Sequence, residues 1–222
     1  MTVDKERKEP TSSYPAEWEQ HRIVQSNLFR QQVETFLRPI PKDVQQRMER
    51  IAEALLLQPQ DTLIDVGCGT GAMVPFIHKY IPLSHIWLCD CSEAMLEQAK
   101  KRFPECHSIH CDFLKLQQAP EKTTELDKVD VVLCNAVFGN FIDQQAALQV
   151  ASHLLKKGGR LVVSHPMGRG FVQRLHESNP AMVPHLLPDR QAWQCLSWRS
   201  WRMTLEYYCD ESELYIARLL KE

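Results

Sequence analysis

The stretch Leu63-Ile64-Asp65-Val66-Gly67-Cys68-Gly69-Thr70-Gly71 decides the fold of this chain. Its first four residues form a β-type run, and three glycines follow at alternate positions. Val74, Ile77 and Ile81 then recur with a helical period. Glycine tolerates positive φ and lets the backbone lie against a ligand, and the N-terminus of a helix attracts anions. The stretch therefore predicts a strand, a tight turn that cradles a ligand, and a helix.

The glycine spacing alone leaves two ligands open. Gly67-x-Gly69-x-x-Ala72 also fits the dinucleotide fingerprint, which binds a pyrophosphate. With Asp65 included, the string Asp-x-Gly-x-Gly-x-Gly resembles motif I of the class I S-adenosylmethionine-dependent methyltransferases. Their ligand lacks a pyrophosphate and carries an ammonium group that an acid can hold. The resemblance implies that the cofactor cradle consists of Asp65, Gly67, Cys68, Gly69 and Gly71.

Length, composition and charge restrict the remaining possibilities. With 222 residues, of which 44% are hydrophobic, we expect a disordered tail at 1–15 and a single α/β domain over 16–222. The net charge of −2 and the scattered basic residues predict neither a nucleic-acid partner nor an anionic membrane. No apolar run reaches the roughly 18 to 20 residues that cross a bilayer, and residues 1–10 lack a signal pattern. We therefore expect a cytoplasmic protein.

The eight cysteines include no Cys-x-x-Cys pair, and several fall in or beside apolar runs. This pattern predicts reduced, mostly buried thiols and no metal site. Cys68, Cys91 and Cys111 are nevertheless expected at the carboxyl ends of neighbouring strands. Thiols gathered there would suit a soft ion such as arsenite, as in the arsenic methyltransferases, but the chain is short and has no dedicated thiol pair.

Two further strands are predicted to end in acids. Residues 85–90 form a strand that ends at Asp90, which would bind ribose hydroxyls in either cofactor family, and Ser92-Glu93 are expected to cap the next helix. Residues 108–112 form a third strand that ends at Asp112. The methyltransferase resemblance implies that Asp112 binds the adenine amino group and that Phe113 packs on the ring, and it favours this family over NAD. The expected cofactor site is completed by Cys91, Met95 and Asn135.

Asn135 follows a predicted fourth strand at 129–134. In class I methyltransferases, donor and acceptor meet at this strand end. The segment Asn135 to Phe141 differs from the Asn/Asp-Pro-Pro-aromatic tetrad of base and amide N-methyltransferases, which argues against such targets. Asn135 and Asn140 are candidates for holding a polar acceptor. Phe138 and Phe141 either wall the pocket or belong to the core.

The C-terminal half completes the predicted sheet. We expect a helix from Asp143, with Lys156-Lys157 at its C-terminal end and Gly158-Gly159 terminating it, and a strand at 160–164. Residues 165–188 contain an amphipathic helix and form a predicted substrate lid, and Asp189 caps a last helix. Residues 200–208 and 213–220 alternate as an antiparallel hairpin, and Trp198 to Arg202 also suit a strand. The expected fold is a seven-stranded, Rossmann-like methyltransferase sheet, mostly parallel, with helices on both faces.

Two amphipathic helices are predicted within residues 16–58, ahead of the first strand. Residues 16–38 carry apolar positions on roughly one side, and the resemblance to small-molecule methyltransferases implies a mobile cap over the active site. The second helix starts at Pro41, ends before Pro59 and is expected to cover the sheet.

These features lead to one hypothesis and two alternatives. The chain is expected to transfer a methyl group from S-adenosylmethionine to a small-molecule acceptor by in-line displacement, as a monomer or weak homodimer. If the acceptor is protonated, His165 is the first candidate base, followed by His110 and His176. The alternatives are a non-catalytic S-adenosylmethionine-binding regulator and an NAD-dependent oxidoreductase.

Overall fold

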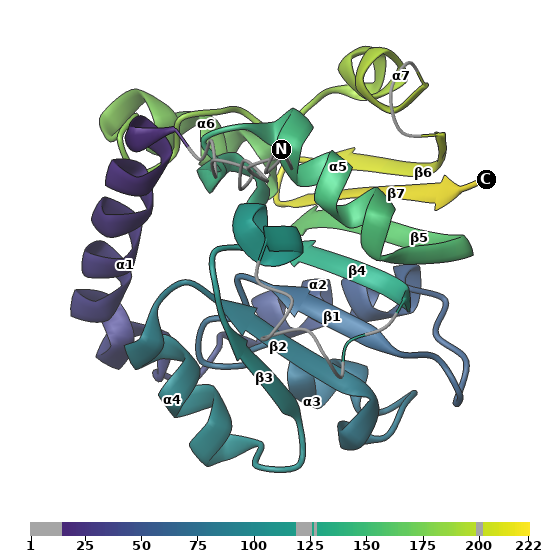
Figure 1. Cartoon of the computed structure of the whole chain (residues 1–222), viewed down its shortest axis with the longest axis horizontal. Coiled ribbons are helices and arrows are strands. Elements are labelled where there is room, and N and C mark those ends of the chain that lie inside the picture. Colours follow the sequence, from purple (N-terminus) through teal and green to yellow (C-terminus); the bar gives the residue numbers. More distant parts are fainter. Residues whose placement is uncertain (1–14, 119–125, 127, 199–201) are drawn as a thin grey trace, which may run out of the picture.

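A seven-stranded sheet with the order β3-β2-β1-β4-β5-β7-β6 organises the computed structural model, which describes residues 15–118, 126, 128–198 and 202–222 (Figure 1). Strands β1 to β5 run parallel, whereas β7 is antiparallel to both β5 and β6. The predicted sheet and its C-terminal hairpin are thus confirmed. The strands are β1 (Leu63–Val66), β2 (Ile86–Asp90), β3 (His107–His110), β4 (Val129–Asn135), β5 (Leu155–His165), β6 (Met203–Glu211) and β7 (Leu214–Lys221).

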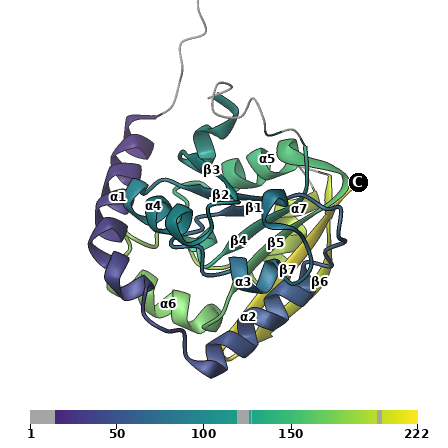
Figure 2. The ribbon, with the colours of Figure 1, turned by 90° about the horizontal axis from the view of Figure 1, so that it is seen from below.

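Helices cover both faces of the sheet (Figure 2). One hydrophobic core includes residues of α2, α3 and α4, and the other includes residues of α5, α6 and α7. Helix α1 packs beside α4, at the end of the sheet where the parallel strands finish. The α-helices are α1 (Ala16–Phe36), α2 (Lys42–Ala54), α3 (Val74–Ile77), α4 (Glu93–Arg102), α5 (Gln144–Leu154), α6 (Gly168–Ser178) and α7 (Arg190–Trp198).

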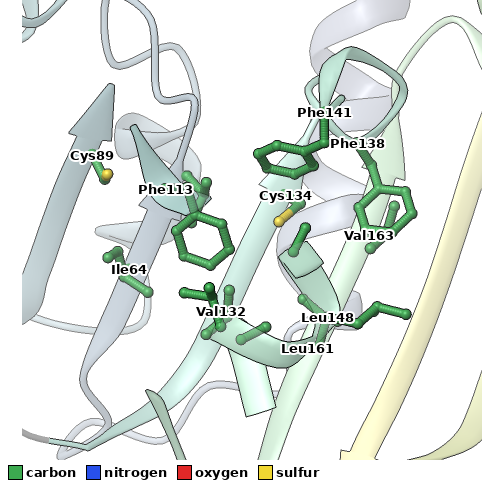
Figure 3. Packing of buried hydrophobic residues seen from close by; sticks show 14 of the residues in the cluster. Ile64, Cys89, Phe113, Val132, Cys134, Phe138, Phe141, Leu148, Leu161 and Val163 are labelled. Carbon is green, nitrogen blue, oxygen red and sulfur yellow. The ribbon is translucent and has the colours of Figure 1, made fainter. Parts of the chain in front are cut away.

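The central strands are buried on both faces, which explains their continuous apolar runs. In β1, Leu63 and Ile64 are fully buried but belong to different cores, because successive side chains point to opposite faces. Figure 3 shows the second of these cores, where Ile64 and Val132 lie near the ring of Phe113. Phe138 is 1% exposed and belongs to this core. This packing holds the strand ends that carry the site in a fixed arrangement.

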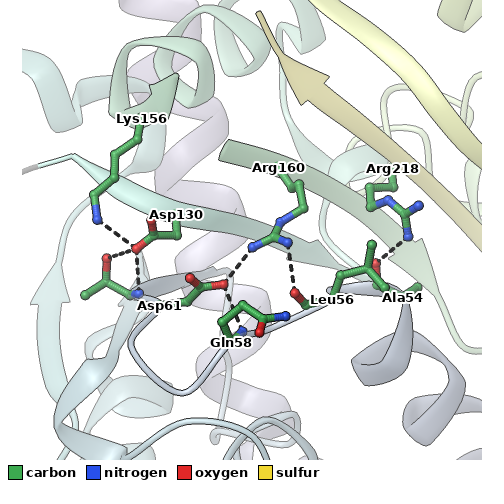
Figure 4. A network of polar contacts seen from close by, with 9 residues as sticks. Ala54, Leu56, Gln58, Asp61, Asp130, Lys156, Arg160 and Arg218 are labelled. Carbon is green, nitrogen blue, oxygen red and sulfur yellow. Dashed lines mark hydrogen bonds and ion pairs between the residues drawn. The ribbon is translucent and has the colours of Figure 1, made fainter. Parts of the chain in front are cut away.

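The segment after α5 differs from the prediction. The helix ends at Leu154, and residues 156–159 lie in β5 rather than at the helix end. Lys156 instead forms an ion pair with Asp130 at 2.8 Å, near the start of β4 (Figure 4). Two other lysines donate to carbonyl oxygens at the C-terminus of α5. The Nζ of Lys221 donates to Leu155 at 2.8 Å, and the Nζ of Lys128 donates to His153. Residues outside the helix thus take the place expected for the local lysines.

Other predicted boundaries also change. Helix α3 has only four residues, so the glycine turn leads into a short helical turn rather than a long helix. Ser92 precedes α4, but its side chain makes no capping hydrogen bond. Trp198 ends α7 instead of lying in a strand, β6 begins at Met203, and residues 199–201 lie outside the described residues, as do 1–14. The predicted cap at Asp189 is confirmed, because its side chain accepts the N–H of Ala192. The helix expected from Asp143 also begins there, and Asp143 caps it by accepting the N–H of Ala146.

Candidate active site

A cavity of 520 Å³ opens at the carboxyl ends of the parallel strands and is lined on one side by helix α1. This volume lies within the range of about 300–1,000 Å³ that is usual for small-molecule sites. Of the residues predicted from the sequence, Asp65 and Gly71 do not line the cavity. Those that do line it are Gly67, Cys68, Gly69, Asp90, Cys91, Met95, Asp112, Phe113, Asn135 and His165.

The three glycines of the turn have positive φ, but their surroundings differ. A Cβ on Gly67 would lie 2.5 Å from Cγ2 of Val137, and one on Gly71 would lie 2.9 Å from the ring of Phe103. Both positions therefore exclude a side chain through packing within the protein. A Cβ on Gly69 would meet nothing within 4 Å. Gly69 thus leaves a free approach to the backbone from the cavity, which is what a bound ligand requires.

Asp90 fastens this turn to the end of β2. Its Oδ2 accepts the N–H of Gly69 at 2.8 Å, and its Oδ1 accepts the N–H of Ser92 at 2.8 Å. Burial raises the pKa of Asp90, and the two backbone N–H groups oppose that rise. The carboxylate therefore sets the shape of the turn and still faces the cavity, where its remaining lone pairs can accept hydroxyl groups.

Asp65 lies behind the turn, at the end of β1. Burial and the nearby charge of Asp90 raise the pKa of Asp65 to about 8, and its Oδ2 has no hydrogen-bond partner. Among the described residues, no Lys or Arg forms an ion pair with either acid. Two adjacent buried acids suit a cationic ligand and disfavour a pyrophosphate. Because Asp65 does not line the cavity, it would not contact the ligand directly, and a cation bound near Asp90 would instead favour the ionised form of Asp65.

Helix α1 supplies cavity residues that the sequence analysis missed. Its inner face is mostly polar, although the predicted cap had an apolar one, and it consists of His21, Arg22, Gln25, Phe29, Gln32 and Phe36. His21 donates through Nε2 to the carbonyl oxygen of Asn140 at 2.7 Å, and the Gln25 amide donates to the carbonyl oxygen of Met182 at 2.5 Å. These hydrogen bonds join α1 to segments more than 100 residues away in the sequence. The only sequence signal for them is the helical spacing of the polar residues.

The segment 165–188, which begins at the end of β5, also lines the cavity. Its contributions are chiefly apolar and consist of Pro166, Met167, Phe171, Val172, Leu175, Met182 and Val183. Asn140 and Phe141 also line the cavity, whereas Phe138 does not. Phe138 thus belongs to the core alone, whereas Phe141 belongs to the core and also lines the cavity. Helix α6 supplies the amphipathic helix expected in this segment.

His165 ends β5 and lines the cavity, while His110 and His176 do not. His110 contacts the carbonyl oxygen of Cys91, and His176 contacts that of Val183 at 2.7 Å. Burial lowers the pKa of His165 to about 4, so the imidazole is neutral at pH 7. Its Nδ1 accepts the N–H of Met167 at 3.1 Å. The ring is therefore held in a single orientation.

All eight cysteines are free, and four of them line the cavity: Cys68, Cys89, Cys91 and Cys111. Burial raises the pKa of the Cys91 thiol to about 12, so it is protonated at neutral pH. Within the described ranges, no group of three or more His, Cys, Asp or Glu side chains is arranged to hold a metal ion. A search of the described helices finds none with the length and apolar character needed to cross a membrane.

Known proteins share both sequence and fold with this chain. Residues 64–161 match the family model described as a methyltransferase domain. The trans-aconitate 2-methyltransferase of Enterobacter sp. (strain 638) is 36% identical over 112 residues, which are 50% of this chain and 42% of that protein. The malonyl-[acyl-carrier protein] O-methyltransferase of Brevibacillus brevis is 29% identical over 155 residues, 65% of this chain and 52% of that protein. The chain thus spans about half the length of these curated relatives.

Solved structures match most of the chain. The N-methyltransferase NodS from Bradyrhizobium japonicum WM9, in complex with S-adenosyl-L-homocysteine, has a TM-score of 0.64 at 13% identity, and the match covers 89% of this chain and 98% of NodS. Magnesium protoporphyrin IX methyltransferase from Synechocystis PCC 6803 has a TM-score of 0.62 at 13% identity, with 92% and 99% covered. The chain thus resembles a methyltransferase domain over residues 64–161, and over most of its length it shares the fold of these solved methyltransferases.

Proposed function

We propose that this chain binds S-adenosylmethionine in the cavity and transfers its methyl group to a small-molecule acceptor. One observation carries the proposal: a glycine turn with free backbone at Gly69 is held by Asp90, beside a second buried acid, at the mouth of a 520 Å³ cavity. A cationic ligand offsets the cost of burying Asp65 and Asp90 without a cation. A dinucleotide would add negative charge at the same place.

The acids at the strand ends would bind different parts of the cofactor. Asp90 would accept the ribose hydroxyls, and Asp112 and Phe113 would hold the adenine, as the family resemblance implies. Asp112 already accepts the N–H of Leu114 at 3.0 Å through Oδ1. Phe113 lies against Phe141, with ring centroids 5.8 Å apart, so an apolar wall is in place for a flat ring. Met95 and Cys91 complete this side.

Methyl transfer requires little from the protein beyond alignment of the donor and the acceptor. When bound, S-adenosylmethionine supplies a methyl group that its sulfonium has already made electrophilic. The chain's residues hold the acceptor in line with that group and exclude water, and such positioning is worth several kcal/mol. Helix α1 and residues 165–188 fit this task because they wall the cavity on the acceptor side.

A small acceptor agrees with the shape and charge of the site. The site is a cavity of 520 Å³, the chain has a net charge of −2, and its longest run of basic residues is the three at 100–102. Methyltransferases that act on RNA need basic surfaces that bind phosphates. The curated relatives are named for trans-aconitate and malonyl-[acyl-carrier protein], which supports a small acyl or acid acceptor here.

The test uses S-adenosylmethionine with a ¹³C-labelled methyl group. Purified protein is incubated in parallel with a small-molecule extract, total RNA and a protein extract, and labelled products are detected by NMR and mass spectrometry. We expect label in the small-molecule fraction alone. Labelled RNA or protein with no labelled metabolite would refute a small acceptor, and cofactor binding without any transfer would indicate a regulator instead of an enzyme.

A further inference from the structure

Two neutral hydrogen-bond donors face the cavity at the ends of β4 and β5, where the acceptor is expected. We infer that they select an apolar carboxylic acid, which is methylated on a carboxylate oxygen without removal of a proton by the protein. This inference rests on the proposed function, because it names the acceptor class for the same cavity. The donors are Asn135 and His165, which belong to adjacent paired strands.

His165 presents a proton to the cavity rather than a lone pair. Its Nδ1 accepts the backbone N–H of Met167 at 3.1 Å, so in the neutral ring the proton is on Nε2. The ring is 8% exposed, lines the cavity and packs against Phe171, with centroids 5.4 Å apart. A histidine that acts as a base needs a free lone pair, and here the only lone pair is taken. His165 is thus a positioning donor, and the sequence-based hypothesis of a base changes accordingly.

The side chain of Asn135 also has a hydrogen-bond donor available to a ligand. Its Oδ1 accepts the hydroxyl proton of Ser164 at 3.0 Å, and Ser164 pairs with Asn135 across the two strands. The acceptor end of the amide is therefore occupied, and the NH₂ group remains available to a ligand in the cavity that Asn135 lines. Two donors side by side match the two oxygens of a carboxylate, and hydrogen bonds to a charged acceptor are stronger than neutral ones.

The rest of the acceptor side suits an apolar body. It is walled by Met167, Phe171, Leu175, Met182 and Phe141. A carboxylate needs no base: an oxygen lone pair forms the new C–O bond, the C–S bond of the donor breaks, and its electrons stay on sulfur. His21 is the competing candidate, because it donates through Nε2 to Asn140 and so keeps a lone pair on Nδ1. An alcohol or thiol acceptor would require such a base.

Binding of matched probes tests the acceptor class without relying on turnover. The full chain is first titrated calorimetrically with S-adenosylhomocysteine, and then, in its presence, with octanoate, octanamide and octanol, and with cinnamate and cinnamamide. We expect each carboxylate to bind about tenfold or more tightly than its amide or alcohol, the range for hydrogen bonds to a charged group. Equal binding of the three types would overturn the inference while leaving the cofactor site intact. Failure to bind S-adenosylhomocysteine would instead refute the proposed function.

Variants of Asn135 and His165 then test whether these side chains act as hydrogen-bond donors. Asn135→Asp keeps the oxygen that Ser164 needs but replaces the donor, and His165→Phe keeps a ring but removes the Nε2 proton. Each should weaken octanoate binding tenfold or more. His165→Phe should change the affinity for S-adenosylhomocysteine less than threefold, and His165→Gln should restore much of the octanoate binding that His165→Phe loses. Because Asn135 is also expected near the cofactor, Asn135→Asp is judged by whether octanoate binding weakens more than S-adenosylhomocysteine binding. Exposed His153 on α5 provides the matched control, because His153→Gln should change neither affinity.

Ring ¹⁵N NMR of labelled histidine supplies an independent readout of the proton positions. We expect His165 to show a protonated Nε2 and an unprotonated Nδ1 at pH 7, with Nε2 shifting when octanoate is added. A protonated Nδ1, or loss of turnover on a labelled carboxylate in His21→Asn with His165→Phe unaffected, would show that the protein uses a base and would overturn the assignment.

Discussion

Replacing Asp65 with Asn removes an ionisable group from a site that lacks a partner for it. Asp65 is 2% exposed, and its Oδ2 makes no hydrogen bond. Asn has nearly the same shape and carries no charge, so Asp65→Asn should leave the sheet unchanged. The expected effect is on the pH dependence of stability, because burial and Asp90 raise the pKa of Asp65 to about 8 from 3.8.

The sign and size follow from proton linkage. Between pH 3.8 and about 8, the unfolded chain has lost the proton of Asp65 and the folded chain keeps it. The folded state therefore binds more protons, and this group lowers the free energy of unfolding as pH rises, by about 1.4 kcal/mol per pH unit. From pH 5 to pH 7 the wild type should lose about 3 kcal/mol relative to Asp65→Asn.

Urea unfolding of both proteins at pH 5, 6 and 7 measures this difference. Other titrating groups, including His165, cancel because both proteins carry them. The contribution of His165 to the free energy of unfolding has the opposite pH dependence. Its pKa of about 4 in the folded state lies below the value of 6.5 for an exposed histidine, so this contribution rises with pH between about 4 and 6.5. Parallel stability curves for wild type and Asp65→Asn would refute the account of Asp65 as a buried, protonated acid.

Four further predictions concern the cofactor turn and the covering helices. Binding of S-adenosylhomocysteine at pH 7 should release protons, because its ammonium group favours ionised Asp65, and the calorimetric heat should then vary with the ionisation enthalpy of the buffer. Gly67→Ala should lower the melting temperature strongly, because its Cβ would clash with Val137, while Gly69→Ala should weaken cofactor binding more than it weakens folding. Asp90→Ala should reduce affinity for S-adenosylhomocysteine at least tenfold, since the turn loses its anchor at Gly69. Amide exchange in α1 and α6 should be fast without ligand and slow when S-adenosylhomocysteine is bound, and equal protection in both states would show permanent covers.

The parts of the fold that depend on local sequence could be predicted. The strand that ends at Asp65, its glycines and the acids at 90 and 112 follow from short-range periodicity and turn chemistry, and the cavity places most of them together. Asp143 and Asp189 were predictable as caps because a cap bonds within its own helix.

The parts of the fold and of the site that depend on tertiary contacts could not be predicted from the sequence. Lys156 and Lys157 suit a helix end and a strand equally well, and the pairing of Leu155 with Val129 decides for the strand. The role of α1 rests on contacts such as His21 with Asn140, which are 119 residues apart. The direction of the His165 hydrogen bond is likewise set by the backbone of Met167, which no spacing rule predicts.

Calorimetric titration of the full chain with S-adenosylhomocysteine, and in parallel with NAD, tests the central claim most directly. The account predicts saturable one-to-one binding of S-adenosylhomocysteine that weakens at least tenfold in Asp90→Ala, and no measurable binding of NAD. Absence of S-adenosylhomocysteine binding, or tighter binding of NAD, would contradict it.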